Sequence, residues 1–354
     1  MRLQAWARRI RTALRTARMV LRGRAVILLY HRVASPPADP FLLCVSPEHF
    51  GQQLDVLRNE YHPIELEELA AACAEGHVPD RAVAITFDDG YADNWQTAAP
   101  ALARRGMQAT VFVAGDCLEG KPFFYDELER FLLWTPRLPR ILHLTLEGRE
   151  YEWDLESWSA RPKKPGADYW KWNIERPTDP TPRHRCFREL YGIMRGMAAG
   201  PRRRALSALR KAAGAGAAPV RLWMTKAEMR AAAKNGTLAF GSHTRTHPAL
   251  NTLSRENQLE EILAGKRMLE TAIARPTRLF AYPYGSPWDV TAESVRLVRE
   301  AGFLAACANT PAPVDAESNP FWLPRCLVRD WDGGEFALRM RDFFRPRAEI
   351  LPQG

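Results

Sequence analysis

The sequence predicts an α/β protein built on a parallel sheet, and three observations support this fold class. Short apolar runs alternate with amphipathic segments over residues 25–114 and again over residues 225–308. The amphipathic segments carry residues typical of helix starts and stops. Polar residues with catalytic chemistry directly follow two of the apolar runs. This alternation favours an open doubly wound sheet or a closed barrel, with functional residues just past the strand ends.

The first half of the pattern supplies three predicted strands and two helices. Ser46 is a good N-cap with Pro47 at the first helical position, and Gly106 is a good stop. The expected strands cover residues 25–30, 82–87 and 109–114, and the expected helices cover residues 46–59 and 94–105.

The second half repeats the alternation. Thr225 and Glu228 form a capping box, and Gly236 closes that helix. The expected strands cover residues 237–241, 278–282 and 303–308, and further helices cover residues 254–274 and 291–301.

The regularity breaks over about residues 118–222, which we interpret as an inserted α+β segment. Residues 141–146 and 151–155 alternate in polarity around a Glu-Gly-Arg turn, which predicts a hairpin. A basic helix is expected over residues 202–211, before a low-complexity AAGAGAAP stretch. The predicted organisation is therefore residues 1–24, a domain over 25–343 that carries the insertion, and a tail over 344–354.

The first 24 residues contain eight arginines and no acidic residue, within a chain of net charge +9. Apolar residues and arginines form two neighbouring stripes at helical spacing, which predicts a basic amphipathic helix. Such a helix could lie on an anionic membrane or dock on the protein's own surface. Arginine interrupts every apolar run, so a secretory signal peptide is not expected. We expect a cytoplasmic protein, peripheral at the inner membrane face.

Composition excludes several other classes. The six scattered cysteines include no Cys-x-x-Cys pair, which argues against a zinc ribbon or a disulfide scaffold. No apolar run reaches the roughly eighteen residues of a membrane span. The positive charge is compatible with nucleic acid, but no recognition motif accompanies it, so no nucleic-acid partner is expected.

Two carboxylates, Asp88 and Asp89, follow the predicted strand over residues 82–87 and precede Gly90. Adjacent carboxylates at a strand end repel each other and are costly to desolvate, and a bound cation would relieve both effects. Asp-Asp-Gly is also a common turn, so this motif alone leaves a structural role open.

The second polar cluster contains His243 and His247, and it follows the strand over residues 237–241. Two histidines four residues apart can direct both imidazoles at one ion, although such a pair alone arises more often by chance. In a parallel α/β fold this strand end shares a face with that of Asp89. One carboxylate and two imidazoles make a three-ligand site with an open position, which is typical of catalysis. Asp88 remains free to act as a base.

These motifs resemble the polysaccharide deacetylase family, which contains the chitooligosaccharide deacetylase homology domain and is also called carbohydrate esterase family 4. The family's Thr-Phe-Asp-Asp-Gly motif is present at residues 86–90, and its His-Ser/Thr-x-x-His motif at residues 243–247. Its Arg-Pro-Pro-Tyr-Gly motif corresponds to Ala-Tyr-Pro-Tyr-Gly at residues 281–285. The resemblance covers about residues 25–114 and 225–343 and implies a deformed (β/α)7-type barrel.

The resemblance also implies roles for individual residues. Asp88 would be the general base, and one divalent metal, zinc in this family, would be bound by Asp89, His243 and His247. The backbone N–H of Tyr284 would help to hold the oxyanion of an N-acetylhexosamine amide under hydrolysis.

Two departures point to a particular branch. The arginine of the third motif is replaced by Ala281, and no histidine follows His247 to serve as the acid. Both features resemble the branch that acts on poly-N-acetylglucosamine and related exopolysaccharides, in which Tyr-His follows the first strand. That makes His31 the best candidate for the acid, against the ordinary interpretation of a histidine held by local hydrogen bonds.

Three further sets of residues have weaker assignments. Arg325 could replace the missing arginine or bind substrate, and Trp331 resembles the end of the family's fourth motif as a sugar contact. Trp170, Trp172 and Trp288 could stack on sugars or pack in the core.

The expected partner is an N-acetylated glycan or its lipid-linked precursor. Two alternatives remain: a deformylase or deacetylase of a polyprenyl-phosphate sugar, and a catalytically inactive carbohydrate-binding relative.

Overall fold

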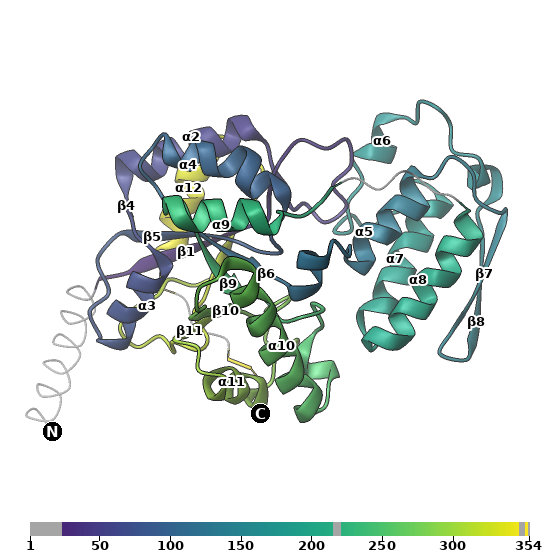
Figure 1. Ribbon diagram of the computed structural model, residues 1–354. Coiled ribbons are helices and arrows are strands. Elements are labelled where there is room, and N and C mark those ends of the chain that lie inside the picture. Colours follow the sequence, from purple (N-terminus) through teal and green to yellow (C-terminus); the bar gives the residue numbers. More distant parts are fainter. Residues whose placement is uncertain (1–22, 215–220, 347–350, 353–354) are drawn as a thin grey trace, which may run out of the picture.

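The computed structural model describes residues 23–214, 221–346 and 351–352. A central parallel sheet is surrounded by helices, and the insertion forms a separate group of helices with one hairpin beside it (Figure 1). The predicted basic helix over residues 1–24 lies almost entirely outside the described residues, as does most of the predicted tail. Within the described ranges, no helix combines the length and apolar character needed to cross a membrane.

The main sheet has eight strands among the described residues, and every strand pair in it is parallel. Their order is β11-β10-β9-β6-β5-β1-β12, and β4 also pairs with β5. This confirms the predicted parallel α/β class. The strands are β1 (Ala25–Tyr30), β4 (His62–Pro63), β5 (Ala82–Phe87), β6 (Ala109–Val113), β9 (Leu238–Ser242), β10 (Leu279–Ala281), β11 (Ala305–Cys307) and β12 (Cys326–Leu327).

A single segment near the C-terminus connects the two edges of this sheet. Leu323 forms a parallel bridge with Cys307 of β11, at one edge. Cys326 of β12 pairs with Leu28 of β1, at the other. The sheet is thus curled into a half-barrel whose open side is spanned by this segment, as in the deformed barrel expected from the sequence. Arg325 lies between the two contact points.

Helices cover the outside of the sheet through their apolar faces. The predicted start signals are present, since the Ser46 hydroxyl accepts from the His49 N–H and Thr225 forms a reciprocal capping box with Glu228. The helices are α2 (Pro47–Glu60), α3 (Leu66–Ala74), the π-helix η1 (Asn94–Ala98), α4 (Ala99–Ala103), α9 (Lys226–Asn235), α10 (Arg255–Ile273), α11 (Ala292–Glu300) and α12 (Gly333–Phe343).

The inserted segment builds a hydrophobic core of its own, formed by apolar residues between Tyr91 and Trp223. The predicted hairpin is present, and its turn places Glu147 and Gly148 at φ values of 50° and 80°. Its elements are η2 (Gly115–Glu119), α5 (Phe124–Leu128), η3 (Glu129–Trp134), β7 (Ile141–Leu146), β8 (Arg149–Asp154), η4 (Glu156–Ser159), α6 (Ala167–Trp170), α7 (Pro182–Arg195) and α8 (Ala199–Ala213). Short elements elsewhere are β2 (Arg32–Val33), β3 (Cys44–Val45) and η5 (Leu250–Thr252).

The structure differs from the predicted elements in a few places. The helix expected over residues 94–105 begins as the π-helix η1 and ends at Ala103. Helix α12 was not predicted because two glycines, poor helix formers, occupy its first turn, where Asp332 caps it. Helix α7 was not predicted because it starts at a proline inside a proline-rich stretch.

Candidate metal and catalytic centre

The residues of the three motifs all lie where a parallel strand of the main sheet ends. Asp88 directly follows β5, and His243 directly follows β9. His31 directly follows β1, and Tyr284 lies in the loop after β10. Because parallel strands present their carboxyl ends at one edge, the fold brings together residues that are up to 253 positions apart in sequence, from 31 to 284.

Asp89, His243 and His247 form a compact set of metal-ligand atoms. One donor atom from each lies within 4.8 Å of the other two, and all three side chains are buried. Asp89 Oδ1 is 3.7 Å from His243 Nε2 and 3.5 Å from His247 Nε2. Within the described ranges this is the one such group of three or more possible ligands.

The details of this set fit a divalent cation. Asp89 Oδ1 is buried and has no hydrogen-bond partner within the described part of the chain. His243 Nδ1 lies 2.7 Å from the carbonyl oxygen of Ala281. A proton on Nδ1 donated to that carbonyl leaves Nε2 with a free lone pair toward Asp89, as is usual for a metal-binding histidine.

The electrostatics of the three residues lead to the same conclusion. Burial, followed by the charges of Asp88 and Asp126, raises the pKa of Asp89 well above its usual range. Burial lowers the pKa of both His243 and His247, so the imidazoles are neutral at neutral pH. Neutral imidazoles and a carboxylate that lacks a counter-charge make a donor set suited to zinc or a similar ion.

Asp88 is held by Arg325 through two parallel hydrogen bonds. Arg325 Nη1 donates to Oδ1 at 2.7 Å and Nη2 to Oδ2 at 2.8 Å, while Nε donates to the carbonyl oxygen of Ala308 at 2.9 Å. Burial raises the pKa of Asp88, but Arg325 and His243 outweigh this and the net shift is downward. Asp88 is therefore ionised, with Oδ2 3.9 Å from His243 Nε2.

Arg325 therefore has the geometry of a brace for Asp88. Its side chain is 0% exposed, and each nitrogen of its guanidinium donates to a protein atom. The alternative prediction, that Arg325 contacts substrate, does not fit this geometry, because no atom of the side chain reaches the surface.

His31 is half-buried, and its Nδ1 atom lacks a hydrogen-bond partner among the described residues. The alternative interpretation, that His31 is a structural residue held by local hydrogen bonds, therefore finds no support at this nitrogen. Burial lowers the pKa of His31 to about 4, although Asp88 acts in the opposite direction. In this state the imidazole is neutral at neutral pH and can accept a proton before donating one.

Tyr284 has a left-handed backbone, with φ of 60°, which costs a non-glycine residue about 1–3 kcal/mol. Its backbone N–H donates no hydrogen bond within the described part of the chain. The ring lies 4.9 Å from the His247 ring, and the guanidinium of Arg195, from helix α7, lies 4.6 Å above it. A strained residue with a free N–H beside the metal ligands fits an oxyanion contact.

The predicted sugar contact at Trp331 receives no structural support. Its ring packs 6.3 Å from that of Phe343 on α12, and its carbonyl oxygen accepts from Gln53 Nε2 at 2.8 Å. Of the other tryptophans, Trp172 is buried in the insertion core, Trp170 packs 4.6 Å from Trp134, and Trp288 is 68% exposed.

The insertion contributes two residues that the sequence did not single out. Tyr125 donates from its hydroxyl to Asp89 Oδ2 at 3.4 Å, and the Phe123 ring lies 4.6 Å from the His247 ring. Aromatic residues in an insertion are more often core than functional, so their spacing carried no signal.

A second feature missed from the sequence is Glu261 on α10, which accepts hydrogen bonds from the backbone of the histidine loop. Glu261 lies 16 and 15 positions after Arg245 and Thr246, whose N–H groups it accepts from. No local sequence motif reveals a contact at this separation.

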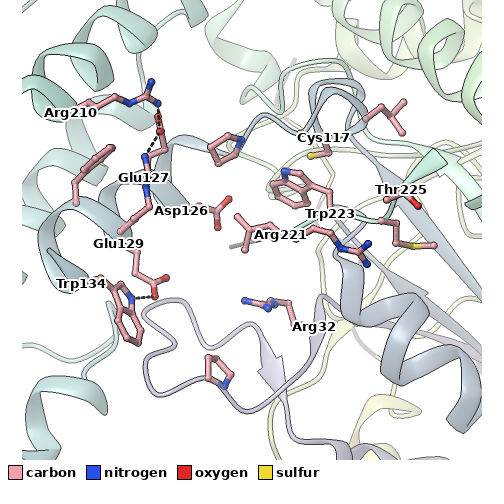
Figure 2. A pocket seen from close by; sticks show the side chains of 18 of the residues that line it. Arg32, Cys117, Asp126, Glu127, Glu129, Trp134, Arg210, Arg221, Trp223 and Thr225 are labelled. Atoms are coloured by element: carbon pink, nitrogen blue, oxygen red, sulfur yellow. Dashed lines mark hydrogen bonds and ion pairs between the residues drawn. The ribbon is translucent and has the colours of Figure 1, made fainter. Parts of the chain in front are cut away.

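A cavity of about 1270 Å³ lies between the insertion and the barrel, separate from the metal ligands. Figure 2 shows Asp126 and Glu129 beside it, with Arg32 on the opposite side. Trp223 lines the cavity and packs 4.8 Å from Phe123, which in turn covers His247. A layer of aromatic rings therefore separates the cavity from the candidate catalytic centre.

Comparison with known proteins agrees with this architecture. Residues 75–131 and 209–306 match the family model described as polysaccharide deacetylase. The unmatched stretch between them lies inside the insertion predicted at about residues 118–222. YxkH of Bacillus subtilis (strain 168), described as a polysaccharide deacetylase, is 34% identical over 103 residues, which make up 28% of this chain. The match spans 36% of the length of YxkH.

Solved structures extend the likeness in fold to most of the chain. The deacetylase PplD of Streptococcus pyogenes gives a TM-score of 0.55 at 17% identity, covering 90% of this chain and 98% of that one. IcaB from Ammonifex degensii gives 0.53 at 18% identity, covering 90% and 97%. At such identities these likenesses establish the fold.

The fold agrees with the family match. The matched residues correspond to the polysaccharide deacetylase domain, and they make up less than half of this chain. Within that domain, the structure places a possible Asp/His/His metal site at the carboxyl ends of β5 and β9.

Proposed function

We propose that this protein is a metal-dependent N-deacetylase that hydrolyses the N-acetyl group of an N-acetylhexosamine, within a polysaccharide or its lipid-linked precursor. The observation that carries this proposal is one arrangement. The carboxylate of Asp88, which is held by a buried arginine, lies beside a set of possible metal ligands. These ligands are Asp89, His243 and His247. A base next to an open metal position is what amide hydrolysis by activated water requires.

Asp89, His243 and His247 would hold the ion. A divalent metal there would polarise the amide carbonyl and make the attacking water more acidic. The remaining steps are assigned to side chains and one backbone N–H group of the protein itself.

Asp88 would accept the proton of the attacking water. Arg325 keeps this carboxylate ionised and fixes the direction of both its oxygens. A base that is already charged and held in one direction needs little rearrangement to reach the transition state, and this lowers the barrier. The backbone N–H of Tyr284 would donate to the carbonyl oxygen as negative charge develops on it.

His31 would move a proton to the leaving amine. Since its pKa is lowered to about 4, the imidazole starts neutral, and it would first gain the proton that Asp88 took from the attacking water. Its Nδ1 atom, without a partner among the described residues, is available for this transfer. The same residue would then donate to the amine nitrogen as the carbon–nitrogen bond breaks.

The nature of the acyl group and of the sugar rests on similarity. PplD was solved in complex with acetate, the product expected of N-acetyl hydrolysis. The missing third-motif arginine and the Tyr30-His31 pair further support the exopolysaccharide branch.

Acetate release from an acetylated chito-oligomer tests the proposal. We expect turnover by the zinc-loaded wild type and a loss of about 10²–10⁴-fold in kcat for Asp88→Asn, with the metal retained. Asp168→Asn, at an exposed position on α6, is the matched control and should leave turnover unchanged. Bound metal without any acetate release would instead favour a carbohydrate-binding relative without activity.

A further inference from the structure

The backbone of the histidine loop, residues 243–247, is held by hydrogen bonds at nearly every N–H. The N–H of His243 donates to the Val113 carbonyl at 3.1 Å, and that of His247 donates to the Thr244 hydroxyl at 3.2 Å. Of the three N–H groups between them, those of Arg245 and Thr246 donate to one side chain outside the loop.

That side chain is Glu261 of α10. Its Oε2 atom accepts from the N–H of Arg245 at 3.1 Å and from the N–H of Thr246 at 2.8 Å. Its Oε1 atom accepts from the Thr246 hydroxyl at 2.8 Å. One carboxylate therefore fixes the stretch between the two metal-binding histidines, and hydrogen bonds to a charged acceptor are stronger than neutral ones.

The loop has a conformation that must be held from outside. Thr244 and His247 have φ values of 63° and 57°, in the left-handed region that residues with a Cβ rarely adopt. Such conformations persist only when the surrounding structure determines them. Because His247 itself is one of these residues, the direction of its imidazole depends on the loop being kept in this form.

Helix α10 also touches the loop through Gly265, one turn after Glu261 and on the same face. A Cβ at Gly265 would lie 2.4 Å from the carbonyl carbon and oxygen of Thr244 and 2.9 Å from the N of Arg245. The helix is therefore in direct contact with the loop backbone. This contact brings the Glu261 carboxylate within hydrogen-bond distance of the loop N–H groups.

We propose that Glu261 is a positioning residue for the metal site, which sets the geometry of His243 and His247 by clamping the backbone between them. This inference rests on the proposed function, since it assumes that these histidines bind a metal.

Zinc affinity tests the clamp directly. In Glu261→Gln the amide nitrogen can only donate, so at least one of the contacts with loop donors is lost. We expect the Kd for zinc, measured by competition with a chromophoric chelator, to rise by about 10–100-fold. Glu260→Gln is the matched control, because Glu260 is an exposed neighbour whose contact is with Arg267, and it should bind zinc like the wild type.

A milder pair of variants covers the case in which Glu261→Gln does not fold. Thr246→Val removes only the hydroxyl contact and should weaken zinc binding by a smaller factor, whereas Thr246→Ser restores the hydroxyl and should restore the affinity. Wild-type affinity in Glu261→Gln, or in Thr246→Val where the former is unfolded, would overturn the clamp and leave the proposed function intact. A wild type that binds no zinc would overturn both.

Discussion

At the scale of single residues, the structure explains how a carboxylate can remain charged inside a protein. Asp88 and Arg325 are 237 positions apart in sequence and form a buried pair with two hydrogen bonds. Removing one partner of such a pair leaves an uncompensated buried charge, which is far more costly than losing the pair as a whole.

Arg325→Met should therefore destabilise the protein by about 3–5 kcal/mol, since Asp88 would lose its counter-charge. The free energy of unfolding, obtained from urea denaturation of metal-free protein, measures this. Arg339→Met is a suitable control, because Arg339 on α12 is 52% exposed and pairs with Glu335 on the surface. Equal stabilities of the two variants would contradict the assigned role of Arg325.

The sequence identifies part of this site and not the rest, for a physical reason. Asp88, Asp89, His243 and His247 belong to short motifs at strand ends, where residue type and predicted element suffice to suggest metal chemistry. Contacts made by Arg325, Tyr125 and Glu261 depend on which segments the fold brings together. For Arg325 the sequence left two roles open, and only the geometry distinguishes them.

At the scale of elements, the insertion combines a core of its own with buried and half-buried acidic residues beside the cavity. Glu129 on η3 accepts a hydrogen bond from Trp134 Nε1 at 2.8 Å (Figure 2). Burial raises the pKa of Glu129 from 4.5 to about 7, although this hydrogen bond acts in the opposite direction. Folding therefore favours the protonated carboxyl.

This shift predicts a pH dependence with a definite sign. The folded state binds the proton of Glu129 more tightly than the unfolded state does, so the free energy of unfolding falls as the pH rises from 4.5 to about 7. Glu129→Gln keeps an oxygen that can accept from Trp134 but has no titratable carboxyl. The variant should therefore not lose stability in this way as the pH rises, a loss of no more than about 3 kcal/mol in the wild type.

Urea denaturation at pH 5 and pH 8 measures the difference. The stability of Glu129→Gln relative to the wild type should be greater at pH 8, whereas Glu150→Gln on the exposed side of β8 should show no such change. A relative stability of Glu129→Gln that does not vary with pH would refute the prediction.

Elements with clear local signals were predicted well. Strands β1 and β5 have their expected bounds because continuous apolar runs mark fully buried parallel strands. Helices α2 and α9 start at their expected caps. Strand β10 is shorter than expected, since pairing in the sheet, and not apolar character, sets where a strand ends.

At the scale of the whole molecule, the positive charge remains to be explained. The net charge is +9, and eight arginines lie in the first 24 residues. We propose that this segment holds the protein against an anionic membrane from the cytoplasmic side, where a lipid-linked substrate would be within reach.

Removal of residues 1–22 should release the protein from vesicles of anionic lipid, while vesicles of neutral lipid should bind neither form. Gly23 and Arg24 are retained because Gly23 lies against the backbone of residues 78–80 and the N–H of Arg24 donates to Asp80. Cosedimentation at low and high salt provides the measurement, since screening weakens attraction to charged lipids. Unchanged partition after the deletion would contradict this proposal.

The central claim is that Asp89, His243 and His247 hold one divalent ion, and its most direct test is metal content. Wild type and His243→Ala would be dialysed to equilibrium against the same low concentration of zinc and analysed by elemental mass spectrometry. The account predicts about one zinc ion per chain in the wild type and a large loss in the variant. Equal zinc content in the two proteins would contradict it.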